Sequence, residues 1–270
     1  IEQRLEGFDV QGIQKGTASA KKLTLSFWCK SNNTGTYNIE LFDNDNQRRV
    51  GFQYTVSSSG TWEQKTVTFP AEANSTYPLG NDNGDSLRVR WFLAAGNNWR
   101  TGTNSGSWAG NTTNQRAENN TSLSKATSNY FALTGCQLEV GDQPTPFEWI
   151  SYSEDLAKCQ RYYYRAHHQI DSGERPLCLG AFETNSQITT ILRFPVTMRT
   201  TPSLSATGSS SWMIRESGTS HGWNTFSLRY GTPQSAEFVH DGTVVSGTAG
   251  RVGMIRGTGT SSKLEFSADL

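Results

Sequence analysis

The chain has no excess of either charge, since 24 Lys and Arg residues balance 24 Asp and Glu residues among its 270 positions. A chain without net charge has no long-range field that would draw it to nucleic acid or to an anionic membrane. Its apolar runs are also too short for a membrane-spanning helix or for the apolar core of a signal peptide. We therefore expect no nucleic-acid partner and no insertion into a membrane.

Motifs of several enzyme classes are missing as well. The chain contains no H-E-x-x-H zinc motif, no Walker loop and no nucleotide-binding glycine fingerprint. His167 and His168 are neighbours that would face opposite sides of a strand, while His221 and His240 stand alone, so the histidines predict no metal site. The sequence predicts a protein that is not an enzyme, with no catalytic residue, metal or cofactor.

Pairs of acidic side chains raise the possibility of glycosidase chemistry. Cleavage of a glycosidic bond needs two carboxyl groups about 5 to 10 Å apart. The pairs Glu40 with Asp43 and Glu237 with Asp241 fall at expected hairpin ends, where we predict that solvent surrounds them.

Two segments rich in Asp and Asn, 43–46 and 81–85, offer several oxygen atoms over a short span, as calcium requires. Neither follows the spacing of a calcium-binding EF-hand loop. We interpret both as turns in which Asp and Asn side chains bond their own backbone.

The four cysteines show no C-x-x-C spacing. Cys29 shares a predicted strand face with apolar residues, and Cys159 falls on a predicted helix stripe; the other two are Cys136 and Cys178. We expect four buried free thiols. Such thiols suit a protein assembled in a reducing bacterial cytoplasm.

Gly, Ser, Thr and Asn are abundant, which favours short strands joined by turns. In the first half, strands are predicted over 22–30, 37–41, 50–56, 67–69, 87–93 and 130–140, with a slip at Gly135. The absence of alternating helices points to an antiparallel jelly-roll or galactose-binding-like β-sandwich over 1–149.

One helix is predicted, within a linker over 150–168. Ser151 stands three residues before Glu154, the spacing of a capping box. Tyr152, Leu156 and Cys159 then recur at helical intervals, so we predict a helix over 152–165.

The second half, 169–270, reads as a separate β-sandwich or barrel of about eight short strands. They are predicted over 177–182, 188–194, 203–206, 212–216, 226–230, 236–240, 251–256 and 264–268. Asp241 and Gly242 form a strong hairpin signal. The fold class is therefore all-β, with two antiparallel β-sandwich modules joined by one short helix.

Aromatic residues near loops are the best candidates for ligand binding. The long segment 94–128 carries Trp99, Arg100 and Trp108, and the second module carries Trp212, His221, Trp223 and Tyr230, most of them within 208–224. These rings would stack on sugars while Arg and Asn bind hydroxyl groups. The alternative is that the rings cap a core or pack against a neighbouring subunit.

The runs TGCQLEVGDQPTPFEW at 134–149 and SYSEDLAKCQRYYYR at 151–165 resemble the module junction of tail-fibre and related structural proteins of tailed bacteriophages. Weaker similarities lie at 23–30 and 194–202. The resemblance implies a virion component of β-sandwich modules, usually a trimer, that often touches the host surface. It also implies a further strand before Ile1, so that the first sandwich would lack an edge.

These observations together predict a non-enzymatic phage virion appendage protein, a tail fibre or similar, that binds host-surface glycan through exposed loops. Its expected partners are further copies of itself, other virion proteins and the glycan. One alternative is a purely structural virion subunit: a decoration, adaptor or fibre shaft. Another is a carbohydrate-binding module of a secreted glycan-active protein.

Overall fold

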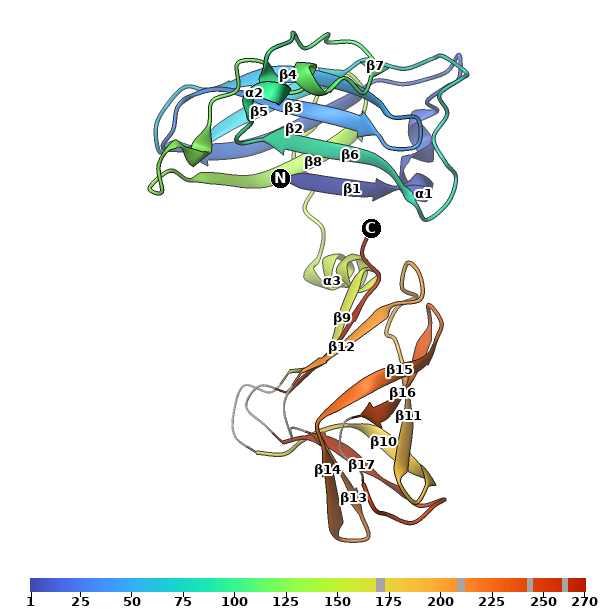
Figure 1. Ribbon diagram of the computed structural model, residues 1–270. Coiled ribbons are helices and arrows are strands. Elements are labelled where there is room, and N and C mark those ends of the chain that lie inside the picture. The colour runs from blue at the N-terminus through green and yellow to red at the C-terminus, as the bar shows by residue number, and fades with distance from the viewer. Residues whose placement is uncertain (169–172, 208–211, 242–244, 259–261) are drawn as a thin grey trace. The chain divides into compact units, whose positions relative to one another are not determined.

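The structure, a computed structural model, describes residues 1–168, 173–207, 212–241, 245–258 and 262–270. It divides into two compact units, Ile1–Trp149 and Ile150–Asp269. Both units are built from antiparallel sheets, so the chain is all-β, as the sequence predicted (Figure 1). Within the described residues, no helix is long and apolar enough to cross a membrane.

The first unit is a sandwich of a five-stranded and a three-stranded sheet. In spatial order the larger sheet contains β1 (Glu2–Glu6), β6 (Asp85–Phe92), β3 (Gly35–Asp43), β4 (Arg48–Val56) and β7 (Ala109–Gly110). The smaller sheet contains β5 (Glu63–Phe69), β2 (Leu23–Ser31) and β8 (Phe131–Val140). The connections hold α1 (Gly7–Val10), α2 (Asn97–Arg100) and the 3-10 turns η1 (Gln11–Ile13), η2 (Thr113–Gln115) and η3 (Leu123–Lys125).

Alternation along the strands explains the core of the first unit. On β2, Leu25, Phe27 and Cys29 are buried, whereas Trp28 lies on the opposite face and is 40% exposed. Phe27 packs edge-on against Tyr54 and Trp91, with ring centroids 5.2 and 5.8 Å away. Burying one such ring contributes about 1.5–3 kcal/mol, so the strand pattern decides which sheet faces pack together.

The predicted slip at Gly135 is confirmed as a β-bulge. The pairing of β2 with β8 shifts between Ser26 and Trp28, and Gly135 adopts a φ of +57°. Side chains rarely tolerate this left-handed conformation, and a Cβ here would also lie 3.2 Å from the Trp28 ring. Glycine is therefore required for β8 to keep Cys136 and Leu138 on the face that lines the sandwich interior.

The helix is shorter than predicted. Helix α3 spans Tyr152–Gln160, and the Ser151 hydroxyl accepts a hydrogen bond from the Glu154 N–H at 3.3 Å, which confirms the N-cap. The predicted C-terminal part is instead strand β9 (Tyr163–His168), which pairs with β18 (Lys263–Ser267). Residues 163–166 form a strand and not a helix, because alternate side chains, those of Tyr164 and Ala166, pack on the core of the second unit.

The second unit also holds two sheets. The seven-stranded sheet contains, in order, β14 (Thr219–Trp223), β13 (Trp212–Glu216), β17 (Val252–Gly257), β10 (Arg175–Thr184), β11 (Gln187–Arg193), β16 (Ser235–Asp241) and β15 (Thr225–Gly231). The three-stranded sheet contains β12 (Ser203–Thr207), β18 and β9. The eight predicted strands are present, whereas β9 and β14, like β1 and β7 in the first unit, were not predicted.

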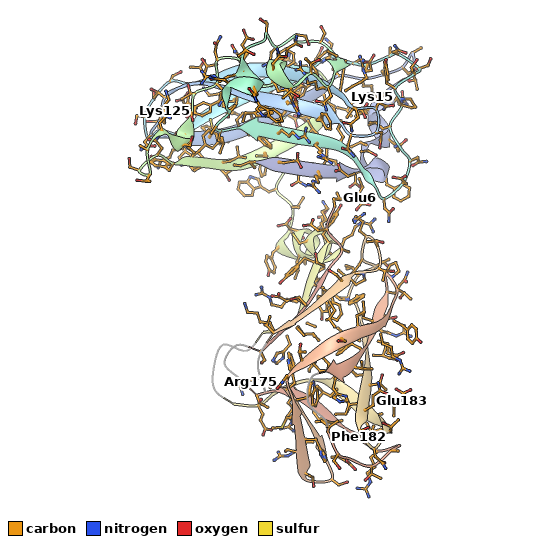
Figure 2. The ribbon with its side chains drawn as sticks, in the orientation of Figure 1. Glu6, Lys15, Lys125, Arg175, Phe182 and Glu183 are labelled. Atoms are coloured by element: carbon orange, nitrogen blue, oxygen red, sulfur yellow. The ribbon has the colours of Figure 1, made fainter. Side chains whose placement is uncertain are left out.

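Two neighbouring residues of β10 show how side chains alternate between the core and the surface of this unit. Phe182 is buried in the core, and Glu183 lies on the surface, where Arg229 pairs with it (Figure 2). The predicted hairpin signal at Asp241 and Gly242 falls where β16 ends; Gly242 and the Asp241 side chain lie outside the described residues. The side chain of His168 lies outside them as well.

The prediction of four buried thiols is correct only in part. Cys29 is buried and Cys178 is half-buried, but Cys136 and Cys159 are exposed. Cys159 is exposed because no residue of α3 is buried within the chain. All four cysteines are free.

We expect brief alkylation of the folded protein at pH 8 to modify Cys159 and, more slowly, Cys136, whose thiol pKa is also raised by burial, but to spare Cys29. Burial raises the pKa of Cys29 to about 11, which lowers its reactive thiolate fraction roughly a hundredfold or more. Mass spectrometry of the digested protein measures the modification at each site. The same reaction in urea is the control, and rapid alkylation of Cys29 in the folded protein would contradict this burial.

Candidate functional site

The two tryptophans predicted to bind ligand in the second unit lie in its core. Trp212 and Trp223 face each other across the β13–β14 hairpin, and both are fully buried. Each packs edge-on against Phe226, with centroid separations of 5.0 and 5.3 Å. Their prediction as sugar-stacking residues is therefore wrong, because strand alternation turns both rings inward.

The other two candidates of this unit are not brought together. His221 lies on β14, with 3.5 Å between its Nε2 and a carboxylate oxygen of Glu216. Tyr230 lies on β15, is 65% exposed, and has the Arg229 guanidinium 5.6 Å from its ring centroid. His221 packs edge-on against the buried Phe182, with ring centroids 5.3 Å apart, whereas Tyr230 lies at the surface, so the two do not share an exposed aromatic site. Residues 208–211 of the predicted loop 208–224 lie outside the described residues.

Residues 218–222, Gly-Thr-Ser-His-Gly, match the letters G-x-S-x-G of a serine nucleophile elbow. A nucleophile elbow places its serine on a sharp turn between a strand and a helix. Ser220 instead lies within strand β14, where it and His221 face opposite sides. The match therefore has no catalytic geometry.

The long segment after β6 carries the remaining three candidates. Trp99 is 38% exposed at the surface, and Arg100 next to it is half-buried. Trp108 packs against the core, and its indole N–H donates a hydrogen bond to the Pro70 carbonyl at 2.8 Å. Of Trp99 and Trp108, Trp99 is thus the more exposed.

A buried ion pair fastens this segment to the five-stranded sheet. Arg116 is almost fully buried, and its Nε donates to Glu40 on β3 at 2.8 Å. Arg90 approaches the same carboxylate at 3.3 Å, and the Arg116 guanidinium lies 5.0 Å from the Trp99 ring. Glu40 was predicted to be solvated, and so was Asp43. Both are fully buried, because the connecting segments fold over this end and face of the sheet.

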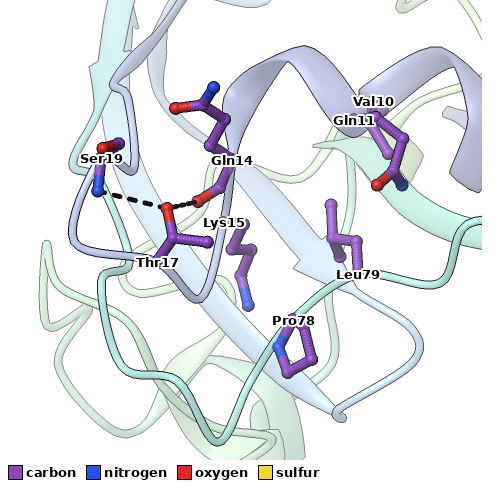
Figure 3. A pocket seen from close by; sticks show the side chains of 8 residues that line it. All are labelled: Val10, Gln11, Gln14, Lys15, Thr17, Ser19, Pro78 and Leu79. Carbon is purple, nitrogen blue, oxygen red and sulfur yellow. Dashed lines mark hydrogen bonds between the residues drawn. The ribbon is translucent and has the colours of Figure 1, made fainter.

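A cavity lies elsewhere, at one end of the first sandwich. It has a volume of about 490 Å³ and lies between the segment after α1 and the segment before β6 (Figure 3). Eight residues line it: Val10, Gln11, Gln14, Lys15, Thr17, Ser19, Pro78 and Leu79. Ligand sites for small molecules and sugars have volumes of about 300–1,000 Å³, so the cavity has the size of such a site.

Tight turns shape one wall of this cavity. The Gln14 backbone is left-handed, with φ +52°, and its N–H closes η1 by bonding to Gln11. The Thr17 hydroxyl donates to the Gln14 carbonyl at 2.7 Å and accepts from the Ser19 N–H at 3.2 Å. At Gly16, with φ +80°, a Cβ would lie 2.8 Å from the Pro78 backbone, so only glycine lets the two walls approach.

Lys15 forms the floor of the cavity. Its Nζ donates to Asp43 at 2.6 Å and to the Tyr77 carbonyl at 2.7 Å, and it lies 4.9 Å from the centroid of the Trp108 ring. The Asn46 amide also donates to Asp43, at 2.9 Å. Trp108 was predicted to contact ligand directly. It does not line the cavity but packs against Lys15, which does.

The cavity can bind neutral polar molecules. Its lining combines two amides and two hydroxyls with the apolar side chains of Val10, Pro78 and Leu79, and none of its eight residues is acidic. In the described part of the chain, the Gln14 side-chain amide makes no hydrogen bond to protein and remains available to a ligand. Hydroxyl-rich ligands with small apolar faces, such as sugar rings, match this lining.

The two segments considered as calcium sites, 43–46 and 81–85, form turns whose carboxylates bond to nearby backbone N–H groups. The Asp45 carboxylate accepts a hydrogen bond from the Gly80 N–H at 2.8 Å, and the Asp82 carboxylate accepts one from the Gly84 N–H at 2.8 Å. Among the described residues, no group of three or more His, Cys, Asp and Glu side chains could hold a metal ion. The first segment therefore positions the wall of the cavity at Pro78 and Leu79.

Sequence reasoning missed the cavity because its lining lacks aromatic residues. The only local signal is the turn-forming run at 11–19, which contains two glycines. It also missed the exposed rings of Trp28 on β2 and of Trp62 just before β5, where Lys30 lies 5.9 Å from the centroid of Trp62. Strand alternation already places Trp28 on the face opposite Phe27.

No protein-family model matches this chain, and no curated protein matches it.

Proposed function

We propose that this chain is a non-enzymatic structural protein of a bacteriophage virion, part of a tail fibre or similar appendage, which attaches to host-surface glycan through the cavity of its first unit. The virion assignment rests on the sequence resemblance at the module junction. The glycan assignment rests on the cavity lined by Gln11, Gln14, Thr17 and Ser19. Assembly in the bacterial cytoplasm and a trimeric state, both implied by the resemblance, belong to the proposal.

The chemistry of the cavity supports a binding role. The Gln14 amide and the Ser19 hydroxyl can donate to and accept from sugar hydroxyls, and Val10 and Leu79 supply an apolar surface for the ring. The Gln11 amide already donates to the Gly7 and Gly80 carbonyls, both at 2.7 Å, so it offers a ligand only its oxygen. A single site of this kind binds weakly, because each net hydrogen bond contributes only about 0.5–1.5 kcal/mol. Several copies in one appendage would raise the apparent affinity through avidity.

We expect Gln14→Asn to weaken glycan binding roughly three- to tenfold, the loss of about one hydrogen bond. Asparagine tolerates the left-handed backbone at this position but draws the amide back from the cavity. Titration of the purified protein with bacterial surface polysaccharides, monitored by calorimetry, measures the affinity. The matched control is Gln47→Asn, since Gln47 has a φ of +53° and lies outside the cavity.

If Gln14→Asn and Gln47→Asn bind polysaccharide equally well, the cavity is not the binding site. Failure of the unaltered oligomer to bind any surface polysaccharide would contradict attachment altogether. Release of new reducing ends from a bound polysaccharide would show an enzyme.

A second candidate is a purely structural virion subunit without a ligand. The burial of Trp212 and Trp223 favours it, since these rings stabilise the second unit and offer no face to a sugar. Assembly and adhesion assays with Gln14→Asn distinguish the two candidates. A structural subunit would assemble and function normally, whereas an attachment protein would assemble normally and adhere more weakly.

A further inference from the structure

Three side-chain oxygen atoms converge beside Gly80, in the segment that precedes β6. A Cβ added to Gly80 would lie 3.4 Å from the Ser86 hydroxyl oxygen. The same point is 3.5 Å from Asp45 Oδ2 and 3.6 Å from Asp82 Oδ1, and no atom of any other residue beyond the two chain neighbours of Gly80 is closer to it. The space beside the Gly80 α-carbon therefore has room for an added atom, and oxygen atoms from three separate residues border it.

Backbone hydrogen bonds hold this arrangement in place. Asp45 lies in the turn between β3 and β4, Asp82 lies between β5 and β6, and Ser86 lies within β6. The Asn44 N–H donates to the Ser86 carbonyl at 2.8 Å, which fixes the turn against the strand. The Gly80 N–H donates to Asp45 at 2.8 Å. The three oxygens thus come together because separate connections of the sandwich meet at this end.

The Ser86 hydroxyl points to a bound ligand. Ser86 is 0% exposed, and in the first unit, all of which the structure describes, its Oγ has no hydrogen-bond partner. A buried hydroxyl without a partner is costly, because folding removes its bonds to water. The hydroxyl oxygen keeps its lone pairs, so a ligand in the adjacent space would satisfy it.

The charge of the group selects a cation as that ligand. Asp45 and Asp82 form no ion pair within the first unit, so neither carboxylate has a basic side chain to balance it. Each accepts a hydrogen bond from a neutral backbone N–H, which leaves both negative charges at the site and leaves further lone pairs on the oxygens. The role of these residues in turns is therefore compatible with binding a cation.

We propose that Asp45, Asp82 and Ser86 bind a calcium ion beside Gly80. Carboxylate and hydroxyl oxygens are hard ligands that suit Ca²⁺ and Mg²⁺. Calcium accepts flexible geometry and six to eight oxygens, whereas magnesium demands a near-ideal octahedron. Asp45 and Asp82 are exposed, so their side chains can rotate toward the ion and water can complete its shell. This inference does not depend on glycan binding.

Calorimetric titration of the full chain with calcium chloride, in metal-free buffer, measures the binding. We expect a dissociation constant of roughly 0.1–1 mM, the range of weak calcium sites. Thermal unfolding measures the linked stability, and about 10 mM Ca²⁺ should raise the Tm of the first unit by about 5 °C. Magnesium chloride at the same concentration should raise it much less.

Gly80→Ala tests the geometry of the site. Gly80 has no left-handed backbone, and the added methyl group would meet only ordinary contacts, so the unit should fold while the space is filled. We expect calcium binding to weaken at least tenfold. The matched control is Gly12→Ala, which should bind calcium like the unaltered chain, because its Cβ would meet no atom within 4 Å.

Asp82→Asn tests the charge of the site. Asparagine keeps an acceptor for the Gly84 N–H but removes the negative charge, so we expect at least tenfold weaker binding. Asp142→Asn, which alters an exposed carboxylate that pairs with Lys22, should leave binding unchanged.

Three results would overturn the proposal. The first is no heat of binding and no rise in Tm at about 10 mM Ca²⁺. The second is an equal rise with magnesium, which would show general screening of charge. The third is equal calcium binding by Gly80→Ala and Gly12→Ala, or by Asp82→Asn and Asp142→Asn, which would place the ion elsewhere.

Discussion

Trp212→Ala is expected to destabilise the second unit by about 3–5 kcal/mol, the range for removing a large aromatic side chain from a core. Trp212 is fully buried, lies opposite Trp223 across the hairpin, and contacts the ring of Phe226. The loss combines the transfer free energy of the indole with the cavity that it leaves. Urea unfolding followed by circular dichroism measures the change in free energy.

Tyr230→Ala is the matched control, because Tyr230 is an aromatic residue of the same unit that is 65% exposed. We expect it to change stability by no more than about 0.5 kcal/mol. Because two compact units unfold within one chain, each transition is fitted separately. A cost below about 1 kcal/mol for Trp212→Ala would contradict the placement of this ring in the core, and would reopen its role in ligand binding.

Lys15→Met is expected to destabilise the first unit by about 3–5 kcal/mol, because it leaves a buried carboxylate without its cation. The Lys15 and Asp43 side chains are 2% and 0% exposed, and their charged atoms are 2.6 Å apart. The substitution also removes the hydrogen bond to the Tyr77 carbonyl and the contact with the Trp108 ring. Thermal and urea unfolding of the first unit measure the effect.

Two comparisons test this reasoning about burial. Lys22→Met breaks the pair of Lys22 with Asp142, in which the side chains are 52% and 64% exposed, and should cost no more than about 1 kcal/mol. The double variant Lys15→Met, Asp43→Asn should recover part of the stability, because the buried charge is then gone. Equal costs for the two lysine substitutions would show that the Lys15 site is open to solvent.

The sequence by itself determined the all-β class, most strand positions and the β-bulge at Gly135. These features depend on local rules: alternation with a period of two, turn residues between strands, and a backbone conformation that only glycine readily adopts. The C-terminal end of helix α3 could not be predicted in this way, because the residues after Gln160 fit a helical and an alternating pattern equally well. Pairing of β9 with β18, about a hundred residues away, decided between them.

Only the tertiary structure decided the candidate site. The alternation of Trp212, Ile214 and Glu216 gives these residues a common face, but it does not say whether that face lies inward. Similarly, the sequence cannot bring Lys15 to Asp43 or to the wall at Pro78, because these contacts join segments 28 and 63 residues apart that no local pattern relates. A pattern assigns side chains to faces, whereas cavities form where distant loops meet, and packing of the whole sandwich selects those neighbours.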